Sequence, residues 1–434
     1  MELPAIVNVL LLGSGGRESA FAWKIAQSPR LGKLFIATGN GGTAASGINV
    51  DISPNDFPMI GQFVQTNHIN LVVVGSEEPL VRGIKDFFIE DENIRHTPIV
   101  GPSKAAAAME GSKEFSKEFM ERHNIPTAKY KSVTKDNLDE GCDFLASLSA
   151  PYVLKADGLA AGKGVLIIDT LAEAQSELRS MILDQRFGAA SSKVVIEEFL
   201  DGIEVSVFVA TDGKSYKILP EAKDYKRIGE GHTGPNTGGM GAISPVPFYD
   251  EVFAEKVRSR IIEPTVDGIA KDELDYRGFI FFGLISCKGE PMVIEYNVRM
   301  GDPETEAVLP RITSDIIDLF DGIVHQTLDT KTVEISPLTA ATVVVTSQGY
   351  PNDYPKGLPI SGLDNQLEEN VTVFHAGTTQ QAGEMLTSGG RVLAITALDN
   401  SIETATAKAY RTIEGIHFEG AYRRGDIGQD LLEK

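Results

Sequence analysis

The chain has 434 residues, of which 42% are hydrophobic and 23% charged, so it carries ample material for packed cores and disorder is excluded as its main state. Forty Lys and Arg residues against 61 Asp and Glu give a net charge of −21, which disfavours a broad surface for nucleic acid or an anionic membrane. There is no apolar run of membrane-spanning length, no signal-peptide pattern and only two cysteines, so we expect a reduced, cytoplasmic protein of roughly three domains.

The first part of the chain alternates apolar strands with helices. The pattern predicts strands at 6–12, 33–38, 71–76 and 99–100, and a helix at 17–28. Such alternation is typical of a parallel, doubly wound sheet. In a sheet of this kind ligands lie at the carboxyl ends of the strands, which are the segments 13–17, 38–43 and 75–79.

The rest of the chain predicts a lobe, two hairpins and a third unit. A helical stretch at 103–123 precedes the lobe, which has strands at 152–156, 165–169 and 194–199 and a helix at 171–185. The hairpins pair 204–210 with 214–219 and 279–286 with 291–296, and a long helix at 250–270 lies between them. After a helix at 315–327 and a linker at 329–339, the third unit has strands at 340–346 and 391–398.

A glycine-rich turn, GSGGRE, follows the first predicted strand at 13–18. Glycines at a strand-to-helix junction let backbone N–H groups approach a phosphate. The dinucleotide fingerprint needs a third glycine where Glu18 stands, and no acidic ribose partner follows Asn40 after the second strand. A small phosphate is therefore favoured over a dinucleotide, while a turn needed only for packing explains this segment equally well.

A second glycine-bearing loop, KADGLAAGKGV at 155–165, joins two predicted strands and has a lysine near each end. A flexible loop with two cations facing it suits the polyphosphate of ATP. It is not a Walker A loop, because Lys163 lacks a following Ser or Thr and a strand follows. A mobile hairpin with solvated lysines is the alternative, which the apolar context of Lys155 disfavours.

The strand that ends at Glu197-Glu198-Phe199-Leu200 could form an adenine hinge, with Glu204 near enough to accept from a ribose hydroxyl. Taken alone, these acids are better explained as a solvated strand end.

Another strand closes with Glu295-Tyr296-Asn297, so Glu295 and Asn297 share one face and present oxygens suited to Mg²⁺. Arg299 continues the alternation and suits a phosphate or a developing anion. The acids that follow at 302–306 could instead form a surface acidic cluster.

The segment 229–241 contains six glycines in thirteen residues and follows the charged run KDYKR at 223–227. We expect it to have no regular structure and to act as a substrate lid, with a disordered surface loop as the alternative. None of the seven histidines has the spacing of a zinc motif.

Taken together, these segments resemble the phosphoribosylamine–glycine ligase (glycinamide ribonucleotide synthetase) family of the ATP-grasp superfamily. The matching motifs lie in family order and include GSGGRE, GNGGT, EGSK, KADGLAAGKGV, VIEEFLDG, DYKRIGE, TGPNTGGMGA, EYNVRMGDPET, FHAGT and GGRVLAITAL. The resemblance implies an α/β and α+β multidomain fold. It has a Rossmann-like N-terminal domain at 1–108, an ATP-grasp core at 109–335 with its small lobe at about 126–200, and a small C-terminal α/β domain at 336–434.

The resemblance also implies a reaction: ATP, glycine and 5-phosphoribosylamine give glycinamide ribonucleotide, ADP and phosphate in purine synthesis, through glycyl phosphate and in a monomer. The implied catalytic residues are Arg299, Lys155 and Asp302. The implied ATP-binding residues are Lys113, Lys155, Lys163, Gly164, Glu197, Glu198, Phe199, Leu200 and Glu204. The implied binding residues for glycine and phosphoribosylamine are Gly15, Gly16, Arg17, Glu18, Asn40, Asp224, Lys226, Arg299, Asp302, Pro303, Glu304 and Thr305. Mg²⁺ or Mn²⁺ would be bound by Glu295 and Asn297.

Two positions depart from the family pattern, which usually has histidine where Ser19 and Tyr225 stand. The first departure affects a hydrogen-bond donor near the ribosylamine phosphate, and the second affects a contact expected on the substrate side. Three other functions stay open: a different ATP-grasp ligase of purine metabolism, a nucleotide-binding oxidoreductase, and a nucleotide-binding regulator without turnover.

Overall fold

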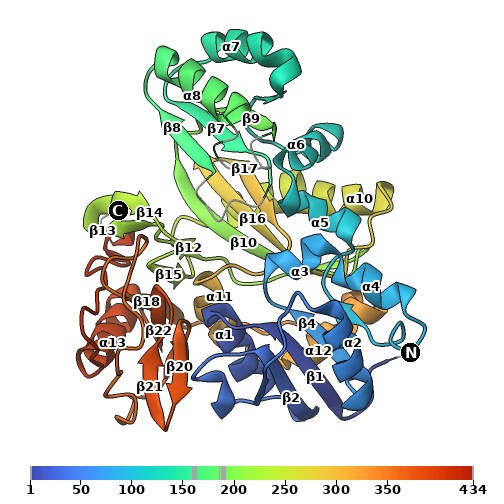
Figure 1. Ribbon diagram of the computed structural model, residues 1–434, viewed down its shortest axis with the longest axis vertical. Helices are drawn as coiled ribbons and strands as arrows, with labels where there is room; N and C mark the ends of the chain where they lie inside the picture. The colour runs from blue at the N-terminus through green and yellow to red at the C-terminus, as the bar shows by residue number, and fades with distance from the viewer. Residues whose placement is uncertain (1, 159–163, 185, 187–191, 433–434) are drawn as a thin grey trace.

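The computed structural model describes residues 2–158, 164–184, 186 and 192–432. Figure 1 shows a small lobe at the top, a central sheet below it, and N-terminal (blue) and C-terminal (red) sheets beside each other at the bottom. The two lower sheets are in contact, because α1 (Gly16–Ile25) packs against β19 (Val371–His375).

The N-terminal sheet is parallel, with the strand order β3-β2-β1-β4-β5. Its strands are β1 (Val7–Gly13), β2 (Leu31–Thr38), β3 (Ile48–Val50), β4 (Leu71–Val74) and β5 (Ile99–Val100). The helices of this unit are α1, α2 (Phe57–Thr66), α3 (Glu77–Arg82) and α4 (Ile84–Glu90). β1 is buried on both faces, since Leu10 and Leu12 join one hydrophobic core and Val9 and Leu11 join another. The predicted doubly wound sheet is confirmed, and only the short strand β3 was not foreseen.

Two helices connect this unit to the small lobe. α5 (Lys104–Gly111) ends at Ser112, whose hydroxyl caps α6 (Lys113–Arg122) by accepting from the N–H of Phe115. The lobe has the strand order β6-β9-β7-β8, covered by α7 (Leu138–Ser147) and α8 (Leu171–Leu183). Its strands are β6 (Tyr130–Val133), β7 (Tyr152–Ala156), β8 (Val165–Ile168) and β9 (Val194–Glu198), so the predicted lobe strands are confirmed.

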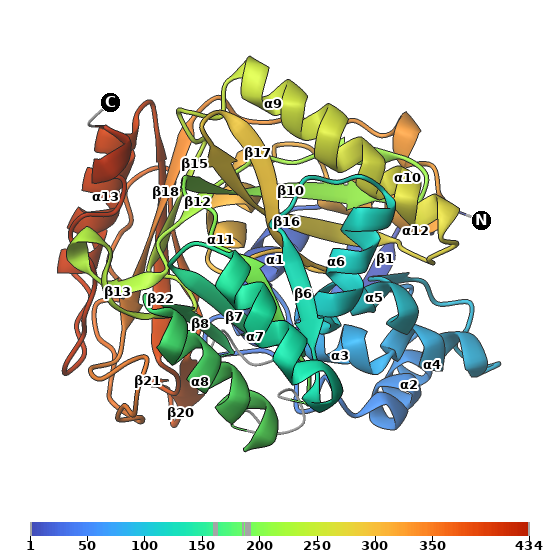
Figure 2. The same cartoon turned by 90° about the horizontal axis from the view of Figure 1, so that it is seen from above.

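The central sheet is antiparallel, with the order β11-β10-β16-β17. It consists of β10 (Ile203–Thr211), β11 (Tyr216–Ile218), β16 (Gly278–Cys287) and β17 (Glu290–Asn297), and both predicted hairpins are confirmed. The predicted long helix is also present: α9 (Glu251–Val257) continues through a π-helical turn, Arg258–Ile262, into α10 (Glu263–Lys271). Figure 2 shows this helix lying along the central sheet. The helices α11 (Glu304–Val308) and α12 (Ile316–His325) follow.

The C-terminal sheet combines strands from two distant parts of the chain, in the order β12-β15-β18-β22-β19. β12 (Lys223–Asp224) and β15 (Gly241–Ser244) come from the middle of the sequence, whereas β18 (Thr339–Thr346), β19 and β22 (Arg391–Asp399) come from the third unit. A small hairpin, β20 (Thr378–Gln381) with β21 (Glu384–Thr387), and the helix α13 (Ile402–Glu414) complete this part. Among the described residues, no helix is both long and apolar enough to cross a bilayer.

The glycine-rich segment at 229–241 is largely regular, so the expectation that it lacks regular structure is wrong. β13 (Arg227–Gly229) and β14 (Thr233–Asn236) form a hairpin, and Gly241 begins the buried strand β15. At Gly241 a Cβ atom would lie 2.6 Å from the backbone oxygen of Thr342, so the glycine permits close strand packing. This glycine signals close approach of two strands.

Candidate active site

The three strand-end loops of the N-terminal sheet meet as the sequence predicted. The amide nitrogen of Asn40 donates to the backbone oxygens of Ser14 at 2.9 Å and of His375 at 2.8 Å. The N–H of Gly39 donates to the oxygen of Gly13 at 3.0 Å. Asn40 therefore ties the GSGGRE turn to the next loop and to the C-terminal sheet.

Glu18 fills the crevice at this turn. Its Oε2 accepts from the N–H of Gly15 at 2.6 Å and its Oε1 accepts from Nε of Arg17 at 2.8 Å. A Cβ atom at Gly13 would lie 2.4 Å from the Glu18 side chain, and one at Gly75 only 2.2 Å from it. This carboxylate occupies the place where a dinucleotide pyrophosphate approaches such a loop, which argues against the oxidoreductase alternative.

Arg17 is buried and already bound to protein groups. Besides Glu18, its guanidinium donates to the backbone oxygen of Met300 at 3.0 Å, and its own N–H donates to Oδ2 of Asp302 at 3.3 Å. Burial alone would lower the pKa of Arg17, but the carboxylates of Glu18, Asp302 and Glu77 outweigh burial and raise it. A phosphate at this turn would therefore compete with the carboxylates of Glu18 and Asp302 for the hydrogen-bond donors of Arg17.

Ser19 is bound to the C-terminal sheet, since its hydroxyl oxygen accepts from the N–H of His375 at 3.2 Å. The short side chain at this departure from the family pattern thus joins α1 to β19.

Asp302 connects three parts of the molecule. Its Oδ1 pairs with Nη2 of Arg391 at 3.0 Å, while Nη1 of Arg391 donates to the backbone oxygens of Gly238 and Asp302, each at 2.7 Å. Burial would raise the pKa of Asp302, but Arg391 and Arg17 outweigh burial and lower it. The neighbouring Glu306 is buried, and burial together with Asp302 raises its pKa well above the ordinary value. Arg391 was not selected from the sequence, although its place in GGRVLAITAL, at the start of a buried strand, was a usable signal.

Arg299 lies beyond the end of β17, so the prediction that it continues the alternation of Glu295 and Asn297 is wrong. The strand ends at Asn297 because the chain then turns toward α5, where Glu110 accepts from the N–H of Val298 at 2.8 Å. Nη2 of Arg299 lies 3.0 Å from Oε1 of Glu110, and its Nε lies 3.4 Å from Glu77. Two acids from the N-terminal part of the chain therefore hold this guanidinium in place.

Two buried lysines share one carboxylate in the small lobe. Nζ of Lys155 lies 2.9 Å from Oε1 of Glu197, and Nζ of Lys117 lies 3.0 Å from Oε2 and donates to the Thr127 hydroxyl at 2.7 Å. Burial would raise the pKa of Glu197, but the two lysines outweigh burial and lower it. Burial lowers the pKa of Lys117 to about 8, although Glu197 acts to raise it. The cluster has one net positive charge, which suits a phosphate.

Lys117 was missed in the sequence, although it lies one turn after Lys113 on α6 and so on the same face. Glu197 lies inside β9 between β6 and β7 with its side chain on the lysines. Phe199 and Leu200 of the predicted hinge lie beyond the end of that strand, which is Glu198.

Asp157 holds Lys113 beside this cluster. Its Oδ1 accepts from the N–H of Lys113 at 2.6 Å, and Nζ of Lys113 donates to the backbone oxygen of Gly158 at 3.3 Å. Burial lowers the pKa of Lys113 despite the nearby Glu295. The backbone oxygen of Gly164 accepts from the N–H of Ala156 at 2.8 Å, while the predicted phosphate-binding Lys163 lies outside the described residues.

Lys226 stands among acids at the edge of the central sheet. Its Nζ lies 2.6 Å from Oε2 of Glu204. Burial would lower the pKa of Lys226, but Asp224, Glu204 and Glu295 outweigh burial and raise it well above the ordinary value. Glu304 belongs to the same group of acids. Burial is the main cause that raises its pKa to about 7, and the charge of Asp224 is the second. The Oε1 atom of Glu304 accepts from the Ser206 hydroxyl at 3.0 Å.

Glu295 and Asn297 fit a magnesium ion by the chemistry of their donors. The amide nitrogen of Asn297 donates to the Tyr296 oxygen at 2.6 Å, so the amide group is oriented and its Oδ1 is left to act as an acceptor. Within the described ranges no group of three His, Cys, Asp or Glu side chains could hold a metal alone. Mg²⁺ takes one or two protein oxygens and completes its shell with phosphate and water.

Tyr225, the second departure from the family pattern, is buried and bound to the C-terminal end of the chain. Its side chain is 1% exposed and its hydroxyl donates to Oδ1 of Asp430 at 2.7 Å. Because side chains alternate along an extended segment, Tyr225 points away from the face that carries Asp224 and Lys226. Pro303 is the N-cap residue of α11, and Thr305 lies in the first turn of that helix.

Comparison with known proteins agrees with this geometry. Models of the phosphoribosylglycinamide synthetase N domain, ATP-grasp (A) domain and C domain match residues 7–110, 111–305 and 340–430. The phosphoribosylamine–glycine ligases of Vibrio cholerae and Haemophilus influenzae are each 44% identical to the chain over 431 residues, 99% of this chain and 99% of theirs.

Solved structures give the same result. The phosphoribosylamine–glycine ligase of Thermotoga maritima matches with a TM-score of 0.82 at 35% identity, covering 97% of this chain and 100% of that one. The biotin carboxylase domain of the Hydrogenobacter thermophilus 2-oxoglutarate carboxylase matches with a TM-score of 0.73 at 15% identity, over 97% of this chain and 92% of that one, and shows the fold alone. The predicted multidomain α/β fold class is confirmed, and the chain belongs to the phosphoribosylamine–glycine ligase family.

Proposed function

We propose that this chain is the ATP-dependent ligase that joins glycine to 5-phosphoribosylamine in purine biosynthesis, giving glycinamide ribonucleotide, ADP and phosphate. The observation that carries the proposal is the cation cluster of Lys113, Lys117 and Lys155, near Glu295 in a chain that matches the family from end to end. The cluster supplies positive charge for a polyphosphate, and the strand end supplies oxygens for a divalent ion.

The reaction requires activation of a carboxylate. The glycine carboxylate attacks the γ-phosphorus of ATP, so glycyl phosphate forms and ADP leaves. Lys113 and Lys155 would hold the phosphates and neutralise their charge, while the strand-end backbone from Glu198 to Leu200 and the Glu204 carboxylate would hold the nucleoside. Glu197 would position Lys155 through their ion pair. Lys163 and Gly164 belong to the loop proposed to cover the phosphates.

The phosphoribosylamine nitrogen then attacks the acyl carbon, and phosphate leaves. Arg299, held by Glu77 and Glu110, would stabilise the negative charge that develops on the reacting oxygens. The glycine and phosphoribosylamine sites are proposed where the turn at 13–18, Asn40, Asp224, Lys226 and the run from Asp302 to Thr305 converge. In this arrangement Arg17 orients Glu18 and Asp302.

Mg²⁺ or Mn²⁺ would be held by Glu295 and Asn297, and would supply charge neutralisation at the phosphate oxygens. We also propose the domain boundaries 1–108, 109–335 and 336–434, a monomeric state and a cytoplasmic location without nucleic-acid partners. The free thiols of Cys142 and Cys287 support the cytoplasmic location. The net charge of −21 supports the proposal that nucleic acids are not partners.

The proposal is tested by measuring phosphate release from ATP with each substrate omitted in turn. Release should require both glycine and phosphoribosylamine, and Glu295→Gln and Asn297→Ala should lower it at least about a thousandfold, as expected on losing a metal ligand at the reacting phosphate. Glu290→Gln, at the far end of the same strand and paired with Lys256 and Arg260, is the control and should retain activity. Release that depends on bicarbonate or formate would instead identify another ATP-grasp ligase.

A further inference from the structure

The segment before the glycine-rich hairpin has two faces. On one face, Lys226 lies 2.6 Å from Glu204, and Asp224 lies close enough for both groups to affect its pKa. On the other face, Lys223 forms an ion pair with Asp430, and the Tyr225 hydroxyl donates to the same carboxylate at 2.7 Å. The segment 223–226, which begins in β12, therefore connects the proposed substrate site to the C-terminal segment 422–430.

Tyr225 is enclosed by this segment. Its hydroxyl also accepts from the N–H of Gly428 at 3.0 Å. Its ring stacks on His232 at 6.0 Å with an interplanar angle of 9°, and the guanidinium of Arg424 lies 5.2 Å from the ring centroid. These contacts fix the ring from both the hairpin and the C-terminal segment.

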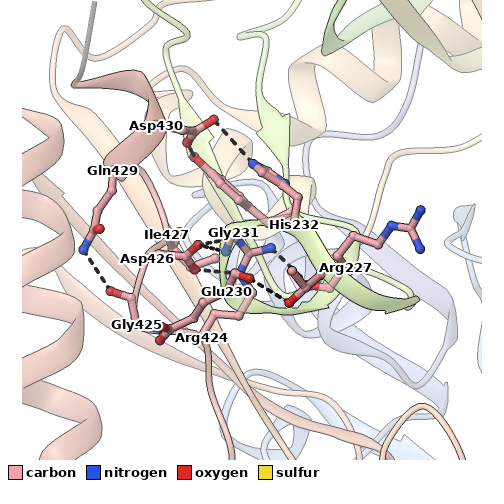
Figure 3. A network of polar contacts seen from close by, with 12 residues as sticks. Arg227, Glu230, Gly231, His232, Arg424, Gly425, Asp426, Ile427, Gln429 and Asp430 are labelled. Atoms are coloured by element: carbon pink, nitrogen blue, oxygen red, sulfur yellow. Dashed lines mark hydrogen bonds and ion pairs between the residues drawn. The ribbon is translucent and has the colours of Figure 1, made fainter.

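The hairpin of β13 and β14 is bound to the same segment. Arg424 has a fully buried side chain that forms two 2.7 Å bonds to Asp426 and donates to the backbone oxygen of Arg227 at 3.1 Å. Asp426 in turn accepts from the N–H of Gly231 at 2.8 Å, and the N–H of Gly425 donates to Glu230 at 2.9 Å. Figure 3 shows these groups converging from the hairpin and from the C-terminal segment.

Apolar packing of the hairpin is limited to β13, where Ile228 contacts the C-terminal core. All four residues of β14 are exposed, and a two-stranded hairpin is marginally stable by itself. Its order therefore depends on the polar contacts with 422–430, several of which involve charged groups.

We propose that the C-terminal segment 422–430 is a positioning element for the active site. By holding Lys223, Tyr225 and the hairpin, it fixes the segment 223–226, in which Asp224 and Lys226 lie on the side of Glu204. Asp430 and Arg424 are positioning residues that act through Lys226. The inference rests on the proposed function, because that function assigns Asp224 and Lys226 to substrate binding.

The test is a double-mutant cycle between Asp430→Asn and Lys226→Met. Asp430→Asn should lower kcat/KM for glycine about tenfold, the scale of one lost hydrogen bond to a charged group, and should change the same kinetic constants as Lys226→Met. In the Lys226→Met background, Asp430→Asn should cause no further loss, because the group through which it acts is gone. Tyr225→Phe, which keeps the ring and removes only the hydroxyl, should have a smaller effect of the same kind.

The control is Asp399→Asn, which breaks a 2.7 Å pair with Lys408 in the same domain away from the hairpin and should leave the kinetic constants unchanged. Hydrogen exchange without substrates gives an independent readout: amides of residues 225–236 should exchange faster in Asp430→Asn and at the wild-type rate in Asp399→Asn. Additive kinetic losses, or unchanged exchange of these amides, would overturn the inference. If the wild-type protein shows no glycine-dependent turnover, the proposed function is overturned. The hydrogen-exchange comparison needs no substrate, so it would still test whether segment 422–430 orders the hairpin.

Discussion

Lys117 shows how one residue can set the charge of a binding site. With Lys117 present, two ammonium groups face the single carboxylate of Glu197, and the cluster keeps one positive charge. Without Lys117, Lys155 and Glu197 would neutralise each other. The net charge that the proposed ATP site offers to phosphate therefore depends on a residue that the sequence did not single out.

Lys117→Met should raise the KM for ATP about tenfold or more and leave the KM for glycine nearly unchanged, because the lost charge faces phosphate and a buried charge interaction is worth on the order of 1.5–3 kcal/mol. Steady-state kinetics with each substrate varied in turn measures this. Lys131→Met, which removes an exposed partner of Glu140 in the same lobe, should change neither constant. An unchanged KM for ATP in Lys117→Met would refute the role given to the cluster.

At the scale of secondary structure, the segment 229–241 shows that a glycine-rich composition does not by itself determine the conformation. Its glycines predict a loop, but Gly241 begins the buried strand β15, where a side chain would meet Thr342 and Ile427. The segment therefore contributes to the C-terminal core.

Gly241→Ala should lower the free energy of unfolding by about 2–4 kcal/mol, because the added methyl group overlaps a backbone oxygen that cannot move without breaking the sheet. Chemical denaturation measures the change. Gly289→Asn is the matched control: that glycine has φ +81° and no atom within 4 Å of the position that a Cβ would take, so Asn should cost about 1 kcal/mol or less. Equal stability of Gly241→Ala and wild type would show that β15 is not packed as described.

The elements that the sequence predicted correctly are those with a local signal. β1, β4 and β18 consist mostly of apolar residues, and both central hairpins combine strand patterns with turn residues. β3 was missed because it has three residues and little burial. The end of β17 at Asn297 and the direction of Tyr225 depend on partners far away in the sequence, Glu110 and Asp430, so no local pattern could reveal them.

The same distinction applies to the site. Lys155, Glu295 and Asn297 stand at strand ends where their spacing is informative. Arg391 and Lys117 matter because of residues distant in the sequence that they meet only after folding, namely Asp302 and Glu197. A lone lysine on an amphipathic helix looks like a solvated one until its partner is known.

For the whole molecule, Arg391 is one of the side chains that join the C-terminal sheet to the other parts. Arg391 contacts Asp302 and the backbone oxygen of Gly238. Asp302 in turn accepts from the N–H of Arg17 on α1. Ser19 and Asn40 add two further contacts to His375. The proposed phosphoribosylamine site thus lies where all three parts meet.

Arg391→Met should raise the KM for phosphoribosylamine about a hundredfold and that for ATP less than threefold, since a buried partner of Asp302 is lost while the lysine cluster lies elsewhere. It should also lower the melting temperature. Arg411→Met, which breaks an exposed pair with Glu368 on the same domain, serves as the control and should leave both constants alone. A larger effect on ATP than on phosphoribosylamine would contradict this placement.

The origin of β12 and β15 has a consequence for synthesis on the ribosome. These strands are synthesised before residues 245–338, and β15 must then wait for its partner β18. At about 5–20 residues per second the wait is on the order of 5–20 s, during which the apolar strand Gly241–Ser244 has an unpaired edge. A fragment beginning at β18 would lack both strands and expose the edge that β15 covers. The last part of the chain therefore cannot complete its sheet from its own residues. The C-terminal core forms only when β18 pairs with β15, which was synthesised earlier.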